Sequence, residues 1–279
     1  MKLAFAALAC SLCSLIVTAQ TTAGGIESRK DSTVRSHAYT AAVGASHQLD
    51  TYLSPRNYQG YQVSLLRETI RHTRLCHGRI SFQTLWQATF SQTHPLYSTR
   101  TDWGGHIGYD ALWHYGWNPA KGLRLMAGAA VGADIGFLYN SSGGNNPAQG
   151  RFNIDLSASV MAIYRFRIGQ KRLSLRYQAN MPLLGMMFSP DFGQSYYEIA
   201  SGYWNGNMHF THLGNAFSLW QQLTFDIPLG RRLVLRTGYL CDIRQSRVGN
   251  IKVHDRSHSF MIGFVHYFRR AATSCPVLL

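Results

Sequence analysis

The most regular pattern in the chain is an alternation of apolar and polar side chains over residues 152–168. A helix repeats every 3.6 residues and would mix the two sets, whereas a strand keeps them on opposite faces. The run also exceeds the usual strand length of about 5–6 residues in soluble domains. The pattern predicts a long β-strand whose apolar face carries Phe152, Ile154, Leu156, Ala158, Val160, Ala162, Tyr164, Phe166 and Ile168.

The same alternation recurs along the rest of the chain and predicts ten strands of similar kind. Their expected ranges are 36–48, 58–74, 79–93, 102–117, 121–139, 151–168, 172–188, 212–228, 232–247 and 252–268.

The connections between these strands alternate in length. Short turns are expected at 75–78, 118–120, 169–171 and 229–231, and longer links at 49–57, 94–101, 140–150, 189–211 and 248–251. Transmembrane β-barrels have an even number of antiparallel strands, short periplasmic turns and longer extracellular loops. We therefore expect an all-β fold, a transmembrane antiparallel up-and-down β-barrel of about ten strands over residues 36–268. Aromatic side chains near the strand ends fit the two membrane interfaces of such a barrel: Tyr115, Trp117, Phe137, Tyr139, Tyr164 and Phe166.

The N-terminus has the three parts of a secretory signal peptide. Lys2 supplies the positive charge, residues 3–17 are apolar, and Val17-Thr18-Ala19 is a small-residue cleavage site. No later window offers the 18 or more apolar residues of a spanning helix. We predict a signal peptide over 1–19, a periplasmic segment over 20–35, the barrel, and a tail over 269–279. The predicted location is the bacterial outer membrane.

Composition and charge indicate which classes of molecule the protein contacts. The formal net charge is +14 with only 14% charged residues, and the basic side chains are spread along strands and loops. This distribution excludes nucleic acid as a partner of an exported protein. It favours contacts with outer-membrane lipid and lipopolysaccharide phosphates, for instance through Arg71, Arg74 and Arg79. The last strand ends on Phe268, an aromatic signal for the barrel-assembly machinery.

Three cysteines remain after the signal peptide, namely Cys76, Cys241 and Cys275. An odd number rules out a complete set of internal disulfides, and the spacing matches no metal site. A disulfide between Cys76 and Cys275 remains an alternative.

Several runs spread over the mature chain resemble an uncharacterised family of Bacteroides-type outer-membrane β-barrels with no assigned function. The resemblance implies the location and the barrel fold, and it supplies no catalytic residues. It is carried by residues 52–55, 58–60, 118–128, 144–149, 187–190, 193–198, 238–245 and 257–263.

Alternation places a set of charged side chains on the inward faces of the strands. An isolated buried charge is costly, so we expect these groups to pair and largely fill the lumen of a structural or surface-binding barrel. Because arginine outnumbers aspartate in the set, a small-solute channel with basic selectivity is the alternative. The predicted lumen network is Asp134, Asp155, Arg165, Arg167, Arg176, Asp226, Arg236, Asp242 and Arg244.

The long link 189–211 is the expected surface-recognition element, through Tyr196, Tyr197, Tyr203 and Trp204. An outer-membrane hydrolase with its site at the extracellular strand ends is a further alternative. A hydrolase needs a nucleophile or water, a base and an orienting group in contact. The spacing of the candidates matches no catalytic signature, and we expect no cofactor, no metal and no identifiable ligand. These candidates are His94, Asp191, Ser195, Glu198, His209 and His212.

Overall fold

The computed structural model describes residues 34–73, 75–95, 101–141, 147–203, 206–230 and 233–269. The predicted signal peptide, residues 20–33 and 270–279, Cys275 and Trp204 lie outside the described residues. Within them, long antiparallel strands dominate. The elements are β1 (Val34–Asp50), β2 (Ser54–His72), the 3-10 helix η1 (Leu75–Gly78), β3 (Ile80–His94), β4 (Asp102–Ala120), β5 (Leu123–Asn140), β6 (Ala148–Ile168), β7 (Lys171–Phe188), α2 (Tyr196–Ala200), β8 (Met208–His212), β9 (Ala216–Pro228), β10 (Leu233–Val248) and β11 (Ile251–Arg269).

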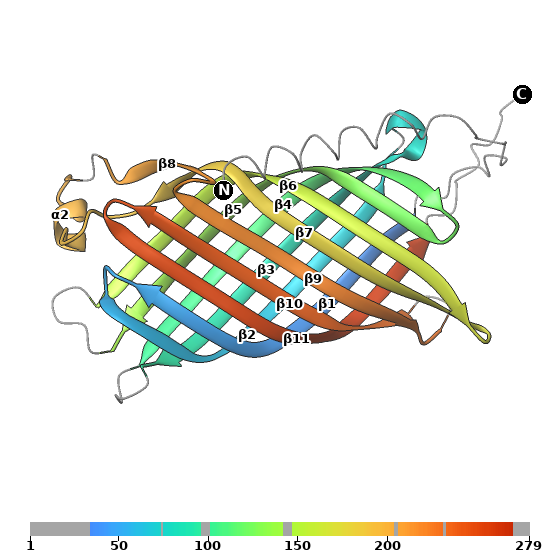
Figure 1. Cartoon of the computed structure of the whole chain (residues 1–279), viewed down its shortest axis with the longest axis horizontal. Coiled ribbons are helices and arrows are strands. Elements are labelled where there is room, and N and C mark those ends of the chain that lie inside the picture. The colour runs from blue at the N-terminus through green and yellow to red at the C-terminus, as the bar shows by residue number, and fades with distance from the viewer. Residues whose placement is uncertain are drawn as a thin grey trace, which may run out of the picture. The chain divides into compact units, whose positions relative to one another are not determined.

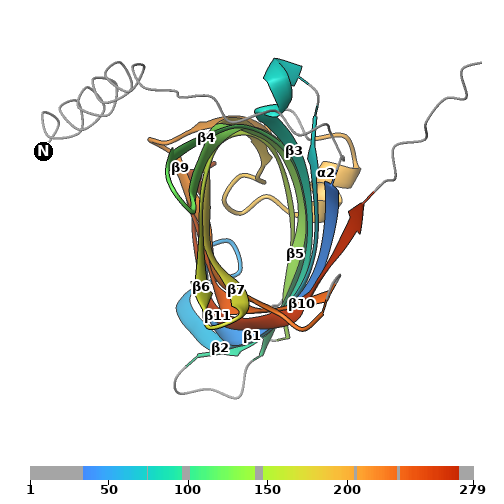
Figure 2. The ribbon, with the colours of Figure 1, turned by 90° about the vertical axis from the view of Figure 1, so that its right-hand side faces the viewer.

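The strands form a closed ring, which confirms the predicted barrel. Each long strand pairs with its neighbours in the chain, β1 pairs with β11, and the sheet closes through β6 and β7. The ring holds ten strands in the order β1 to β7, β9, β10 and β11 (Figure 1; Figure 2 looks along it). Full closure leaves the ring without an unpaired edge.

The extra strand β8 corrects the predicted limits of the long link 189–211. Both β8 and β9 pair antiparallel with β7, β8 with its Leu184–Phe188 end and β9 with Ser174–Asn180. They are one wall strand interrupted at residues 213–215, where the Asn215 side chain accepts from the His212 backbone N–H at 2.8 Å. The link therefore ends at Asn207, and His209 and His212 belong to the wall.

The predicted alternation of short and long connections, strict apart from the modest last link, is also wrong at the first link. The link predicted at 49–57 is only the turn 51–53, and the link at 248–251 is the pair Gly249-Asn250. Both residues of that pair have a positive φ, 58° and 61°, as a two-residue hairpin turn requires. The longer links 95–101, 141–147 and 189–207 nevertheless share this end of the barrel, which we call the loop end. The other end, with the barrel's first and last residues, is the turn end.

The outward face of the strands is apolar. Large side chains that are about half exposed or more cover it, including Leu65 at 61%, Ile135 at 62% and Phe260 at 63%. Soluble proteins do not expose apolar surface on every strand, and a barrel in lipid does. The buried positions are more often polar than apolar, for example Ser64, Gln83, Gln178 and Thr224. No helix in the described part of the chain is long and apolar enough to cross a membrane.

Candidate functional site

An ion pair crosses the lumen in its turn-side half. Glu68 on β2 and Arg176 on β7 lie five strands apart in either direction around the ring, so they come from opposite walls. Arg176 Nη1 donates to Glu68 Oε1 and Nη2 donates to Oε2, each at 2.6 Å. The bidentate geometry is the strongest that an arginine and a carboxylate can form. The pair therefore ties opposite walls of the barrel together.

Further side chains complete this crossing and leave its charges paired. Arg236 donates to Asp226 through Nε at 2.7 Å and Nη2 at 2.9 Å, and its Nη1 lies 3.3 Å from Glu68 Oε1. Gln83 and Gln222 each donate an amide N–H to Glu68 Oε2. All are at most 6% exposed. We call Glu68, Gln83, Arg176, Gln222, Asp226 and Arg236 the closing network.

A mostly apolar layer lies against the closing network. Trp220 on β9 donates its indole N–H to Gln87 on β3 at 2.8 Å, and these strands also face each other across the ring. The other members pack as one buried cluster, so the lumen is filled here by side chains rather than by solvent. The cluster contains Ala42, Leu66, Leu85, Leu112, Ala130, Trp220, Leu240 and Met261.

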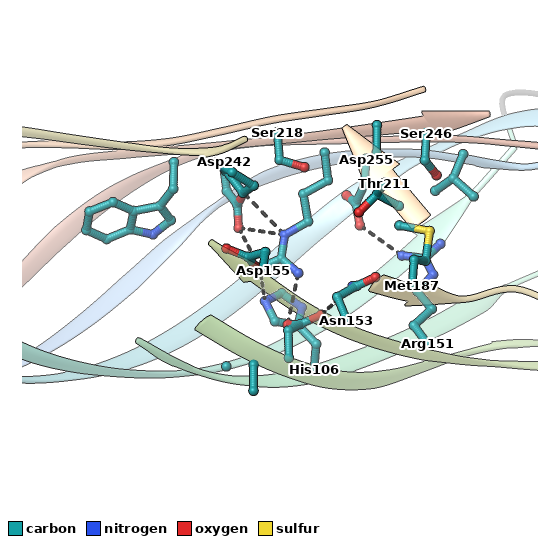
Figure 3. Close-up of a pocket in the computed structure, with 18 of the residues that line it drawn as sticks. His106, Arg151, Asn153, Asp155, Met187, Thr211, Ser218, Asp242, Ser246 and Asp255 are labelled. Carbon is teal, nitrogen blue, oxygen red and sulfur yellow. Dashed lines mark hydrogen bonds and ion pairs between the residues drawn. The ribbon is translucent and has the colours of Figure 1, made fainter. Parts of the chain in front are cut away.

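A cavity of about 170 Å³ occupies the loop-side half of the lumen, with Trp220 and Gln87 in its lining. Its lining reaches Ser246 and Val253, beside the Gly249-Asn250 turn. Arg244 crosses it, donating to Asp134 at 2.9 Å, and also bonds Asp242 and the His106 ring (Figure 3). We call this space the loop-side cavity.

A second arginine spans the cavity nearer the loop end. Arg151 on β6 donates to Asp50 on β1 at 3.0 Å. It also donates to Asp255 on β11 at 3.4 Å (Figure 3). β6 and β1 are again five strands apart around the ring. Arg151 and Arg244 are thus each held by two carboxylates, and neither has a positive charge left unpaired.

The cavity contains more carboxylates than cations. Its lining holds five aspartates, namely Asp110, Asp134, Asp155, Asp242 and Asp255, against Arg151 and Arg244. Asp110 and Asp155 approach each other beside Gly132, where an added Cβ would lie 2.6 Å from Asp110 Oδ1 and 3.2 Å from Asp155 Oδ2. Neither carboxylate forms an ion pair among the described residues. The buried Asn153 Oδ1 on the same wall has no hydrogen-bond donor.

The predicted lumen set divides between these two regions and a third place. Arg176, Asp226 and Arg236 belong to the closing network, and Asp134, Asp155, Asp242 and Arg244 line the cavity. Arg165 and Arg167 are exposed near the turn end and take part in neither. Sequence reasoning missed the inward charges Asp50, Glu68, Asp110, Arg151 and Asp255. The prediction that arginines outnumber carboxylates on the inward faces is therefore wrong, because carboxylates are the more numerous group in the lumen.

The predicted recognition loop is partly fixed to the barrel rim. The Tyr196 hydroxyl accepts from the Gly150 backbone N–H, and its ring packs edge-on against Tyr52 at 6.0 Å. Burial beside Tyr196 raises the pKa of Tyr52 to about 12, and its hydroxyl donates to the Gln194 carbonyl at 2.7 Å. Tyr197 and Tyr203 remain 81% and 72% exposed. Tyr196 thus anchors the loop, and Tyr197 and Tyr203 face outward.

The hydrolase candidates do not assemble into a catalytic group within the described residues. Ser195 and Glu198 form the capping box of α2, with Glu198 Oε2 accepting from the Ser195 backbone N–H at 2.7 Å. His209 bonds the Ser189 carbonyl at 3.3 Å, and His212 Nδ1 accepts from the Gly214 N–H at 2.9 Å. Each has a local structural partner. The remaining candidates, His94 and Asp191, are exposed.

Cysteine and metal chemistry are not assembled in the described chain either. Among the described residues, the exposed Cys76 and the buried Cys241 form no disulfide, and the Cys76–Cys275 alternative is not tested because Cys275 lies outside them. In the same residues, no group of three histidine, cysteine, aspartate or glutamate side chains is arranged to hold a metal ion.

Several solved barrels resemble the fold at low identity. The outer membrane protease OmpT from Escherichia coli is 7% identical, with 90% of this chain and 100% of that chain covered and a TM-score of 0.48. The translocator domain of the autotransporter NalP from Neisseria meningitidis is 12% identical, with 96% and 97% covered and a TM-score of 0.40. A FadL homologue from Pseudomonas aeruginosa is 8% identical, with 86% and 90% covered and a TM-score of 0.34. Similarities this remote do not bear on what the chain does.

Comparison of the sequence with known proteins and families identifies one family. No curated protein matches the chain. Residues 7–273 match a family described as a protein of unknown function, DUF3316, and this match spans nearly the whole sequence. An uncharacterised family was expected, and the match does not bear on a Bacteroides origin. The chain belongs to the DUF3316 family of proteins of unknown function.

Proposed function

We propose that this protein is an outer-membrane surface-binding barrel that conducts no solute and takes a small cationic group into the loop-side cavity. The observation that carries the first part is the Glu68–Arg176 pair, which joins opposite walls at 2.6 Å. Opening this path would strand buried charges, at a cost of several kcal/mol. A channel with basic selectivity is the weaker alternative, because the loop-side cavity carries an excess of carboxylates.

The second part is supported by the surplus charge in the cavity. Asp110 and Asp155 lie together without an arginine partner, while both neighbouring arginines are already paired. Buried carboxylates left in this state are costly unless a cation or proton joins them. A cavity of about 170 Å³ accommodates a primary amine or a guanidinium group rather than a folded peptide. The ligand class is therefore a small organic cation that enters from the loop end.

Two measurements on the purified barrel test this proposal. In planar bilayers we expect no conductance steps above background, and regular open-channel events would refute the closed lumen. In calorimetric titrations we expect agmatine to bind. Asp110→Asn should weaken agmatine binding roughly tenfold, because a charge-assisted hydrogen bond is lost. Asp191→Asn, which removes an exposed loop carboxylate, is the matched control. Equal effects of the two substitutions would refute cavity binding.

The location is tested separately. We infer export by a signal peptide cleaved after Ala19 and insertion in the outer membrane through the barrel-assembly machinery, as in Bacteroides-type barrels. Membrane fractionation followed by N-terminal sequencing should give a mature chain that begins at Gln20 in the outer-membrane fraction. Recovery of the uncleaved chain in the inner membrane would contradict this.

A further inference from the structure

The outward face of β11 changes character along its length. From the loop end, the outward positions are Lys252, His254, Arg256 and His258, followed by Phe260, Ile262 and Phe264. Side chains two residues apart share a face of a strand, so these seven form one continuous strip on the outer wall. Lys252, Arg256 and His258 are exposed. The strip is basic toward the loop end and apolar toward the middle of the barrel.

The two strands beside β11 extend the basic part. Arg247 on β10 is paired in register with Lys252, and His47 on β1 is paired with Arg256. Both are exposed and outward-facing. When the Gln245 side-chain amide is turned so that its oxygen faces Arg256, that oxygen accepts from Nη2 at 2.9 Å and from Nε at 3.2 Å. We call His47, Arg247, Lys252, His254 and Arg256 the basic patch.

The carboxylate nearest in sequence does not neutralise the basic patch. Asp255 lies between His254 and Arg256, but strand alternation turns it into the lumen, where it bonds Arg151 at 3.4 Å. Among the described residues, no ion pair involves Arg247, Lys252 or Arg256. Several positive charges therefore lie together on the wall without a protein anion. Their mutual repulsion favours the binding of an external anion.

The basic patch is confined to one side of the barrel. On β5 the outward positions nearest the loop end are Tyr139, Phe137 and Ile135, all apolar and at least 42% exposed. On β11 the corresponding apolar positions begin only at Phe260, which is 63% exposed, with Val43 of β1 in register beside it. The wall at β10, β11 and β1 thus offers cations directly beside an acyl-binding surface.

We propose that the basic patch binds the phosphate of a membrane-lipid head group in the leaflet at the loop end, with an acyl chain lying along Phe260, Ile262 and Phe264. Guanidinium and ammonium groups donate strong charge-assisted hydrogen bonds to phosphate. The apolar strip below them distinguishes a lipid from a free anion. The longer links of outer-membrane barrels are extracellular. This inference rests on the proposed outer-membrane location, in which the lipid is the phosphorylated glycolipid of the outer leaflet.

The test uses the full barrel, stripped of lipid in detergent and titrated with diphosphoryl lipid A under native mass spectrometry. The variant Arg247→Ala/Lys252→Ala/Arg256→Ala removes three charges from the basic patch. The control Arg167→Ala/Lys171→Ala/Arg172→Ala removes three exposed charges at the turn end. We expect the first variant to weaken binding tenfold or more and the control to change it less than threefold. Equal losses in both variants would overturn the proposal.

Two further measurements test whether the lipid phosphate, rather than another cause, accounts for the loss of binding. The variant Arg247→Lys/Arg256→Lys keeps the charge and should retain most of the binding, which excludes a folding defect as the reason for the loss. Lipid A freed of both phosphates should bind at least tenfold more weakly than the diphosphoryl form, and inorganic phosphate should not displace the lipid. Equal binding of the dephosphorylated lipid would overturn the proposal. Asp110→Asn should leave lipid binding unchanged, so a failure of cavity binding is distinguishable.

Discussion

The turn-side and loop-side halves of the lumen handle buried charge in different ways. In the closing network, Glu68 accepts three hydrogen bonds from arginine and Asp226 accepts two, so both arginines have a carboxylate partner. In the loop-side cavity, Asp110 and Asp155 are left over after Arg151 and Arg244 have found partners. Because both halves belong to the same ten strands, the difference lies in the side chains. Complete pairing closes a lumen, and incomplete pairing leaves a place for a ligand.

The largest effect is expected when the acceptor that both arginines of the closing network share is removed. Glu68→Ala leaves Arg176 without its carboxylate partner and Arg236 with only Asp226. Removing one partner of a buried pair costs about 3–5 kcal/mol. We expect a loss of that size in the free energy of unfolding, measured by guanidinium titration of the barrel in lipid vesicles. Glu68→Gln should lose less unfolding free energy, since its amide oxygen still accepts hydrogen bonds. A loss below about 1 kcal/mol for Glu68→Ala would show that the ion pairs of Glu68 do not stabilise the barrel.

A smaller effect is expected where the two halves meet. Trp220→Ala removes the indole and its hydrogen bond to Gln87, and large aromatic truncations cost about 3 kcal/mol or more in tight cores. Here the gap opens into an existing cavity, so we expect about 2 kcal/mol by the same unfolding titration. The enlarged cavity should also bind spermidine more tightly relative to agmatine. Trp220→Phe is the control, and unchanged selectivity would show that Trp220 does not limit the ligand.

Within the cavity, paired and unpaired aspartates should behave differently. Asp134 accepts from Arg244 at 2.9 Å and from Asn153 at 3.1 Å, so Asp134→Asn should lower the free energy of unfolding by about 1–3 kcal/mol. Asp110→Asn removes a carboxylate that no arginine holds and should leave stability unchanged or raise it by roughly 0.5 kcal/mol. Thermal unfolding of the two variants side by side checks this. A larger loss for Asp110 would mean that it has a stabilising partner.

Much of the barrel was predictable because alternation is a local property. The run 152–168 fixed both faces of β6, and the tight turns fixed where most strands end. The interruption at 213–215 was not predictable, because β8 is defined by its pairing with β7 rather than by its own five residues.

The site was only partly predictable. Glu68 shares its inward parity with Gln62 and Ser64, and Asp110 shares it with His106 and His114, so their direction was available from the sequence. Which inward groups meet across the lumen was not available, because the partner of Glu68 is Arg176 on the opposite wall. That contact depends on the number and stagger of the strands. Arg165 shows the converse limit, since correct parity near a strand end still leaves a side chain in solvent.

The smallest expected effect concerns Glu198, an exposed carboxylate that is also paired, though only with its own helix cap. Hydrogen bonds from the backbone N–H and the hydroxyl of Ser195 hold the pKa of Glu198 below its usual value. A lowered pKa means that the carboxylate stabilises the cap at neutral pH and that this stabilisation is lost as pH falls through the lowered pKa. In NMR spectra of the barrel in micelles, the Ser195 amide shift should titrate with a midpoint below the ordinary glutamate value of about 4.3. Glu198→Gln should abolish the titration and leave the unfolding midpoint of the barrel unchanged, as expected for a surface substitution. A midpoint at or above the ordinary value would mean that the capping box does not form in solution, and that the loop carrying Tyr197 and Tyr203 is held to the rim without it, through Tyr196 and Tyr52.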